Sequence, residues 1–313
     1  MHRHIGHFEG QAHGPLVITI GGIHGNEPAG VLAIGEALKI LHALQTTRSD
    51  FVFKGTVIGL IGNLPAFSAG KRFIQEDLNR AWTFAKVARA LATPIFQLEA
   101  ESKQIRVLAA MIRRIIKARQ PGTVVLIDLH TTSAEGGIFC IPTDEGPSLS
   151  LAKGMCAPVI LDLMKDIEGT VLQYAMEGRF HFQGYPQTCL GVAFEAGQHH
   201  DPNSVGRSVA AILHGLCAAG CMETSFIDKR FNALLAQPSA LLPTVTRLRY
   251  VHKIKAEDQF RMKPGYLNFQ YIQQGEHLAD DRKGPVYAPF EGYILMPLYQ
   301  VQGSDGFFVV TEA

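Results

Sequence analysis

The chain has 313 residues, 47% of them hydrophobic, which is enough to bury the core of one large domain or of a large and a small one. Its 29 Lys and Arg residues balance 28 Asp and Glu residues, and no block of like charges occurs. We therefore expect neither a nucleic acid nor a membrane as a partner. The five cysteines form no C-x-x-C pair, and no apolar run is long enough for a membrane-spanning helix. These properties favour a soluble cytoplasmic protein with reduced cysteines.

The first 240 residues alternate apolar runs of strand character with longer runs of helical periodicity. We expect strands at residues 15–22, 53–63, 123–130, 137–143 and 189–197, and helices at residues 27–44, 97–119, 146–165 and 204–220. Several of these strands are apolar on both faces, as the central strands of a covered sheet are. The alternation predicts an α/β fold with a mixed, mostly parallel central sheet and helices on both faces.

The sequence changes character after about residue 240. A proline-containing connector at 237–245 is followed by short strand-like pieces separated by Gly, Pro and Asp turns, and no helical pattern interrupts them. We therefore expect an α/β domain over residues 1–240 and a small all-β domain over residues 241–313.

A glycine-rich turn follows the first expected strand. Its sequence, GGIHGNEPAG, carries His24 and Glu27 three positions apart. The turn stands at the carboxyl end of a buried strand, where open α/β sheets place their ligand sites. Its glycines allow the backbone and a ligand to approach closely. The apolar run VVLIDLHTT then ends in Asp128 and His130 at another strand exit.

Two histidines and one carboxylate at one sheet edge are typical ligands of a catalytic zinc ion, with a fourth position left for water. We therefore predict that His24, Glu27 and His130 bind one Zn²⁺ ion. Asp128 lies two residues before His130 on a strand and is a candidate to accept the other ring N–H of a ligand histidine. Other divalent ions, such as cobalt or nickel, stay open.

Another carboxylate ends the apolar run LGVAF. Hydrolysis of an amide needs a group that carries protons to the leaving nitrogen, and Glu195 is our candidate because it follows this run directly. A carboxylate at the end of a buried strand is costly unless it is hydrated, paired or used in chemistry. A structural ion pair is therefore the alternative role for Glu195.

The segment KRFIQEDLNRAW, residues 71–82, has little amphipathic regularity and is expected to form a loop over the site. Asn79 and Arg80 are a natural clamp for a carboxylate, because a guanidinium binds it with two parallel hydrogen bonds and an amide adds direction. Arg72 is a candidate to stabilise the oxyanion that develops during attack on a carbonyl. Without a metal site, these arginines would be ordinary surface charges.

These motifs, together with NLPAF and FEAGQ, occur in an order and spacing similar to the succinylglutamate desuccinylase and aspartoacylase family, which is more distantly related to the zinc carboxypeptidases. The resemblance covers about residues 15–200 and, more loosely, the β-rich C-terminus. It implies a zinc-carboxypeptidase-like fold and one zinc ion held by His24, Glu27 and His130. Glu195 resembles the glutamate that activates the attacking water. The implied reaction is hydrolysis of a small N-acyl amino acid to a carboxylate and a free amino acid.

The resemblance also suggests substrate contacts. Arg72 resembles the arginine that polarises the carbonyl, and Asn79 and Arg80 resemble the pair that holds the α-carboxylate. Aspartoacylases use a further arginine shortly before the catalytic glutamate, but this sequence has none there, and Arg179 is the nearest basic residue. Tyr293 matches either a substrate-contacting tyrosine or an aromatic residue of the sheet. The acyl group and the amino acid therefore stay open.

Two other functions remain as alternatives. A zinc carboxypeptidase acting on short peptides would use the same ligands, clamp and glutamate, and a C-terminal domain capping the active site would favour single amino acids over peptides. A non-enzymatic relative would retain the fold alone, but such a protein has no need of metal ligands, an oxyanion donor and a carboxylate clamp together. The sequence also leaves homo-oligomerisation open.

Overall fold

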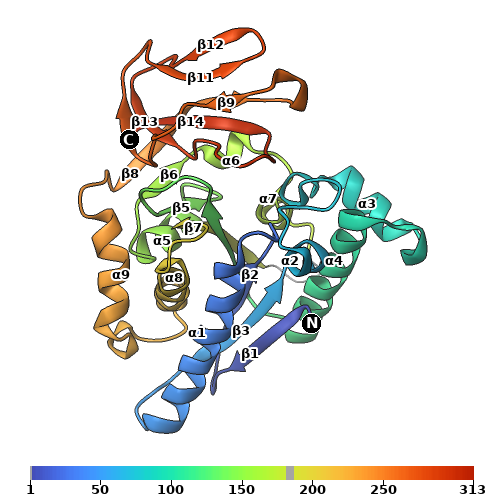
Figure 1. The fold of residues 1–313 in the computed structure, drawn as a ribbon. Helices are drawn as coiled ribbons and strands as arrows, with labels where there is room; N and C mark the ends of the chain where they lie inside the picture. The colour runs from blue at the N-terminus through green and yellow to red at the C-terminus, as the bar shows by residue number, and fades with distance from the viewer. Residues whose placement is uncertain (1, 181–186) are drawn as a thin grey trace.

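The computed structural model describes residues 2–180 and 187–313, and within them one large mixed sheet and one small sheet (Figure 1). The large sheet runs in the order β1 (His4–Glu9), β3 (Lys54–Ile61), β2 (Ala12–Gly21), β4 (Thr123–Thr132), β7 (Thr188–Gln198), β5 (Phe139–Pro142), β6 (Val159–Leu161), β8 (Val245–Lys253), β14 (Asp305–Glu312), β13 (Gly292–Leu295) and β10 (Gln270–Ile272). The small sheet consists of β12 (Gly284–Tyr287), β11 (His277–Asp281) and β9 (Arg261–Met262).

The centre of the large sheet is parallel. Strands β3, β2, β4 and β7 run in one direction, β5 is antiparallel to β7, and β6 and β8 follow parallel to β5. Because β2, β4 and β7 are parallel neighbours, their carboxyl ends meet at one edge of the sheet. The predicted α/β fold with a mixed, mostly parallel central sheet is confirmed.

Helices cover both faces of this sheet (Figure 1). The α-helices of the described residues are α1 (Pro28–Thr47), α2 (Leu64–Ala69), α3 (Phe84–Ala92), α4 (Ala100–Arg119), α5 (Pro147–Gly154), α6 (Leu163–Asp166), α7 (Val171–Met176), α8 (Ser204–Ala218) and α9 (Lys229–Ser239). Short 3₁₀ helices are η1 (Leu78–Arg80), η2 (Ile95–Gln97), η3 (Thr224–Phe226) and η4 (Ala256–Asp258). Helices α1, α5 and α8 pack on one face, and α3, α4 and α7 pack on the other.

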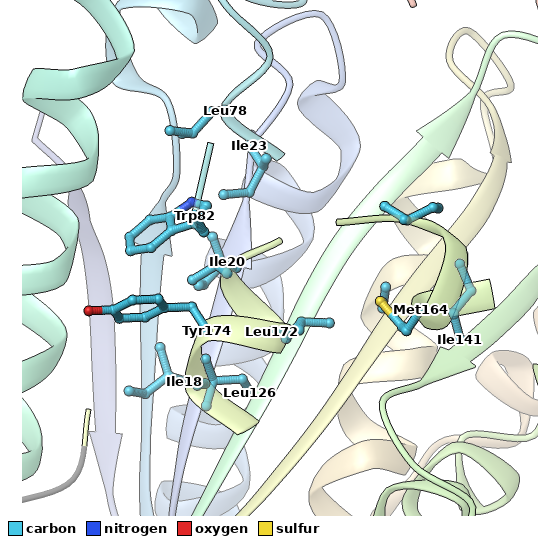
Figure 2. Close-up of a cluster of buried hydrophobic side chains, with 14 of the residues drawn as sticks. Ile18, Ile20, Ile23, Leu78, Trp82, Leu126, Ile141, Met164, Leu172 and Tyr174 are labelled. Atoms are coloured by element: carbon cyan, nitrogen blue, oxygen red, sulfur yellow. The ribbon is translucent and has the colours of Figure 1, made fainter. Parts of the chain in front are cut away.

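The alternation of side chains along the strands places a hydrophobic core on each face of the central sheet. Leu126 of β4 faces α4, whereas its neighbours Val125 and Ile127 face α1 and α8. Figure 2 shows the core on the α4 side, where Trp82 and Tyr174 pack beside residues of β2 and β4. Strand β4 is buried almost throughout, which explains its continuous apolar sequence.

The structure differs from the sequence expectations in a few elements. The helix expected at 146–165 is divided into α5, β6 and α6. Pro158 disfavours a continuous helix, and Cys156 and Asp162 have positive φ angles of 60° and 64°, which no α-helix contains. Strand β1 was not expected, because it lies at the sheet edge and has only one buried side chain. Helices α3 and α9 were not expected either.

After α9, the regular elements of the C-terminal region are strands and the short helix η4, in agreement with the expected β-rich character. Strand β8 pairs with β6, and β14, β13 and β10 follow it, so the large sheet continues into this region. The small sheet lies at the outer end of the molecule, beside β13 and β14 (Figure 1). The domain boundary at residue 240 stays a prediction. None of the helices that the structure describes combines the length and apolar character needed to span a bilayer.

Candidate metal centre and active site

The turn after β2 is packed against the loop that precedes α3. Gly25 donates its backbone N–H to the carbonyl of Arg72 at 3.1 Å. A Cβ atom at Gly25 would lie 2.0 Å from the carbonyl carbon of Ala66, so a glycine is required at this close approach. Pro28 then occupies the first turn of α1, where its missing N–H costs nothing. The turn therefore holds His24 and Glu27 at a fixed place above the sheet.

His24, Glu27 and His130 meet at this edge of the sheet. His24 Nδ1 lies 2.8 Å from Glu27 Oε1, and His130 Nδ1 lies 3.0 Å from Glu27 Oε2. The backbone N–H of Thr131 also donates to Glu27 Oε2, at 3.1 Å. One potential ligand atom from each of His24, Glu27 and His130 lies within 4.8 Å of the others, and all three side chains are buried. This spacing is compatible with a shared metal ion.

Each of the two histidines also has a carboxylate close to its other ring nitrogen, Nε2. His24 Nε2 lies 3.1 Å from Asp77 Oδ1, and His130 Nε2 lies 3.0 Å from Asp128 Oδ2. If each Nε2 carries the proton, the Nδ1 lone pairs are free to bind a cation, which is the usual arrangement around metal-binding histidines. Asp128 was a candidate for this position in the sequence. Asp77 was missed, and the only available signal was its place in the same segment as Arg72 and Arg80.

The electrostatics of the group also fit a cation. Burial by itself would raise the pKa of Glu27, but His24 and His130 hold that pKa well below its ordinary value. Burial would lower the pKa of His130, but Asp128 and Glu27 raise it well above its ordinary value. Buried carboxylates on both sides of two imidazoles need positive charge between them, and a divalent metal ion supplies it. The residues present therefore fit a zinc-type ion.

Glu195 lies beside the histidines on β7. Its Cα pairs with that of His130 across β4 and β7, so both residues stand at the same level near the carboxyl ends of their strands. Glu195 Oε2 is buried and has no hydrogen-bond partner among the described residues. Burial raises the pKa of this carboxyl to about 7. No ion pair of Glu195 occurs within the part of the chain that the structure describes.

The loop over the site is held in place by Glu101 in the first turn of α4. Its carboxylate accepts hydrogen bonds from the backbone N–H groups of Ile74, Gln75 and Glu76 at 2.7, 3.0 and 3.3 Å, and from the side chain of Asn63 at 2.9 Å. Glu101 is 1% exposed. This contact was not anticipated from the sequence, because no local pattern links Glu101 to a loop about 25 residues earlier.

Within this loop, Arg72 lies near the candidate metal ligands. Its Nη1 is 3.5 Å from Glu27 Oε1, and its Nη2 donates to Asp77 Oδ2 at 3.1 Å. Asn79 and Arg80 belong to η1, which Asp77 caps by accepting the N–H of Asn79. Arg72 Nε, Asn79 Oδ1 and Arg80 Nε are buried without a hydrogen-bond partner among the described residues. These atoms are therefore available to a ligand.

Arg80 also contacts the C-terminal region. Its Nη2 donates to Asp305 Oδ2 at 2.6 Å, and Asp305 Oδ1 accepts from Lys253 at 2.7 Å. The candidate metal ligands, Arg72, Asn79, Arg80 and Glu195 line a cavity with a volume of about 100 Å³, together with several residues between Met296 and Phe308. The cavity thus brings together side chains from both ends of the chain.

Two residues of the predicted set lie elsewhere. Arg179 is paired with Glu177 at 3.1 Å and stacks over Phe84 at 4.5 Å from the ring centroid. Tyr293 on β13 donates to Glu312 at 3.1 Å and makes an edge contact with Tyr271. Neither residue lines the cavity in the described part of the chain, and the substrate contacts suggested for them stay predictions.

Comparisons with known proteins agree with this geometry. Residues 13–200 match the family model of the succinylglutamate desuccinylase/aspartoacylase catalytic domain. A probable aspartoacylase from Nostoc sp. is 30% identical over 134 residues, an alignment that spans 42% of this chain and only 40% of that protein.

Solved structures share the fold. The product-bound ectoine utilization protein EutE (DoeB) from Ruegeria pomeroyi is 18% identical with a TM-score of 0.61, covering 98% of this chain and 87% of that one. Murine aminoacylase 3 is 16% identical with a TM-score of 0.60, covering 97% of this chain and 96% of that one. At these identities the similarity shows the fold and not the substrate.

Proposed function

The chain belongs to the succinylglutamate desuccinylase/aspartoacylase family, and from this premise we propose that it is a zinc-dependent deacylase that hydrolyses the amide bond of a small N-acyl amino acid. The observation that carries the proposal is the convergence of His24, Glu27 and His130 at one strand edge, with Glu195 paired opposite His130. Relatives in this family are deacylases.

In this proposal, His24, Glu27 and His130 would hold one Zn²⁺ ion, and Asp77 and Asp128 would orient the two imidazoles. When bound, Zn²⁺ polarises a carbonyl and lowers the pKa of water. The donor set of two imidazoles and a carboxylate is that of zinc hydrolases, which supports zinc over Mg²⁺ or Ca²⁺, since these prefer oxygen ligands alone.

Glu195 would take a proton from the attacking water and deliver it to the nitrogen of the leaving amino acid. Its buried, unpartnered Oε2 supports this role, because a general base needs an oxygen that no other group occupies. Arg72 would stabilise the negative charge on the carbonyl oxygen. It stands 3.5 Å from a metal-ligand oxygen, and hydrogen-bond donors beside a developing oxyanion lower the barrier to its formation.

Asn79 and Arg80 would bind the α-carboxylate of the amino acid. Asp305 accepts a hydrogen bond from Nη2 of Arg80, and Nε of Arg80 has no hydrogen-bond partner among the described residues. We assign residues 1–240 to a catalytic domain and residues 241–313 to a domain that restricts access to the cavity. The cavity has a small volume, and residues between Met296 and Phe308 form part of its lining. Both features favour single acylated amino acids over peptides as substrates.

A substrate screen tests the proposal. Protein loaded with Zn²⁺ and protein treated with a chelator are incubated with a panel of N-acyl amino acids and with N-acylated dipeptides, and the free amine released is measured. We expect hydrolysis of N-acyl amino acids by the zinc-loaded protein alone. Equal rates after chelation would contradict the metal role, faster cleavage of the dipeptides would favour a carboxypeptidase, and no cleavage of any compound would contradict deacylase activity.

A further inference from the structure

One wall of the cavity beside Glu195 is apolar. Ala193 lies two residues before Glu195 on β7, so both side chains are on the same face of the sheet. The register partner of Ala193 in the neighbouring strand β5 is Ile141. Both are 4% exposed and line the cavity. The apolar surface therefore begins two residues along β7 from Glu195, the carboxylate that would transfer the proton.

Short helices extend this wall. Met164 and Ile167, from α6 and the residue that follows it, and Leu172 from α7 line the same cavity, as does Phe308 from β14. Figure 2 shows Met164 and Ile141 on the side of the core cluster away from Trp82, with Leu172 between them and Tyr174. Each of these side chains is 9% exposed or less. The apolar wall, defined as Ile141, Met164, Ile167, Leu172, Ala193 and Phe308, is thus an opening of the hydrophobic core toward the site.

Positive charge is scarce in the cavity. Among the described residues, only two arginines line it, and both already have carboxylate partners: Arg72 with Asp77 and Glu27, and Arg80 with Asp305. The sequence between Arg179 and Arg207 contains neither Lys nor Arg. If Arg80 receives the α-carboxylate of the substrate, no second arginine or lysine remains for another carboxylate.

The acidic side chains that line the cavity also disfavour a second carboxylate on the substrate. Glu27, Asp128, Glu195 and Asp305 all line the cavity, so four acidic side chains face the two arginines. With Asp77, the partner of Arg72, and Lys253, the partner of Asp305, counted as well, five acidic side chains face three basic ones, and a bound divalent ion would at most balance this difference. Several hydroxyl groups of the lining already make hydrogen bonds within the chain: Thr170 accepts the N–H of Gln173 and caps α7, Thr131 contacts His199, and Ser304 donates to Asp305. A second substrate carboxylate would meet repulsion and would lose its hydration against the apolar wall.

We infer that the variable group of the substrate is uncharged and apolar, so that the protein prefers N-acyl amino acids with one carboxylate over those with two. This inference rests on the proposed function, since it names the substrate class of the same site. The apolar group is either the acyl chain or the side chain of the amino acid. Both flank the scissile amide, and the wall lies directly beside Glu195.

Two matched substrate series separate these sources. The first varies the side chain and compares N-acetyl-leucine and N-acetyl-methionine with N-acetyl-aspartate and N-acetyl-glutamate. The second varies the acyl group and compares N-butanoyl-glycine and N-hexanoyl-glycine with N-succinyl-glycine. With zinc-loaded protein, we expect kcat/KM to be about 10- to 200-fold higher for the apolar members in the series whose group contacts the wall.

Calorimetric binding to a Glu195→Gln variant provides a readout that does not depend on turnover. We expect the apolar members of the same series to bind more tightly than the acidic ones. Preferential hydrolysis or binding of the acidic members, or equal treatment of the two classes, would overturn the inference but leave the proposed function standing. If no compound is hydrolysed, the proposed function fails, and the calorimetric order still decides whether the site prefers an apolar ligand.

A pair of methionines gives a matched control. Met164 in the wall is 9% exposed, and Met222 in the core on the opposite face of the sheet is 7% exposed. Met164→Ala is expected to lower the preference for the apolar over the acidic substrates about 5- to 10-fold, and Met164→Leu is expected to retain it. Met222→Ala should leave that preference unchanged. An unchanged preference in Met164→Ala would show that Met164 does not contribute to the selection of apolar substrates.

Discussion

The guanidinium of Arg80 donates a hydrogen bond to Asp305 at 2.6 Å, although 225 residues separate them in the chain. Arg80 belongs to the loop over the candidate site, and Asp305 begins the strand β14 of the C-terminal region. Lys253 on β8 contacts the second oxygen of Asp305. This cluster joins the proposed carboxylate clamp to the C-terminal strands, so the stability of those strands and the position of Arg80 are linked.

Replacing Asp305 should destabilise the fold. Asp305→Asn leaves Arg80 and Lys253 without their anion, and because Asp305 is 8% exposed, we expect the free energy of unfolding to fall by about 1–3 kcal/mol. Urea denaturation measures this change. The exposed Arg48–Asp50 pair is the control, since Asp50→Asn should leave the denaturation midpoint unchanged. A loss for Asp305→Asn no larger than for Asp50→Asn would show that the buried cluster is not stabilising.

The contribution of Asp305 should depend on pH. Burial by itself would raise its pKa, but Arg80 and Lys253 hold the pKa below its ordinary value. The folded state therefore binds the proton less readily than the unfolded state, and the stabilisation is complete above the unfolded pKa of about 3.9. It is lost as the pH falls through the lower folded pKa. We expect the stability difference between the native protein and Asp305→Asn to be constant from pH 7 to 5 and to shrink below pH 4 in urea titrations. A difference that grows on acidification would contradict this assignment.

Glu195 should be needed for turnover and not for folding. Glu195→Gln keeps the shape of the side chain but removes the basic oxygen, so we expect kcat to fall about 10²- to 10⁴-fold on a substrate identified by the screen. Zinc content and melting temperature measured on the same preparation should stay close to the native values. If turnover is unaffected, the proton transfer must be assigned to another group.

Zinc should stabilise the folded protein through the three candidate ligands. Since a ligand that binds only the folded state adds about 4 kcal/mol at 1,000 times its Kd, we expect Tm to rise on adding Zn²⁺ after chelation. The rise should vanish in His24→Ala and Glu27→Gln. His214→Ala changes a buried histidine that contacts Asn232 and not the cavity, and it should retain the zinc-dependent rise. Loss of the rise in all three variants would point to nonspecific damage.

Glu101 should position the loop that carries Arg72 and Asp77. Glu101→Ala removes the acceptor for three backbone N–H groups, so we expect a loss of about 1–3 kcal/mol in stability and faster amide hydrogen exchange at residues 74–76. Activity should decrease more than zinc affinity, because His24, Glu27 and His130 remain in place. Glu99→Ala, at an exposed position two residues earlier, is the control. Unchanged exchange in Glu101→Ala would show that the loop is held by other contacts.

Much of the central fold could be predicted because it is encoded locally. Strands such as β4 are apolar on both faces, and helix α4 repeats its apolar residues with helical spacing, so period and composition identify them. The same locality explains the errors. The polar edge strand β1 depends on pairing with β3, and Val159–Leu161 forms β6 because it pairs with β5 and β8. Pairing partners are distant in sequence, and no local pattern reports them.

At the site, the apolar runs of the sequence were sufficient to identify the side chains near the carboxyl ends of the strands. His24, Glu27, His130 and Glu195 each follow or end an apolar run, and the parallel order of β2, β4 and β7 is enough to bring such residues to one edge. The structure brings His24, Glu27 and His130 together as potential metal ligands. Their chemical roles stay predictions.

The surroundings of those side chains depend on how distant segments meet in the folded chain. Asp77 behind His24, Glu101 beneath the loop and Asp305 against Arg80 are polar contacts between segments that carry no shared motif. The apolar wall is likewise assembled from β5, β7, β14 and short helices. The physical reason is that buried hydrogen bonds, ion pairs and packing depend on distances across the folded chain, whereas strand and helix patterns depend on neighbours in sequence.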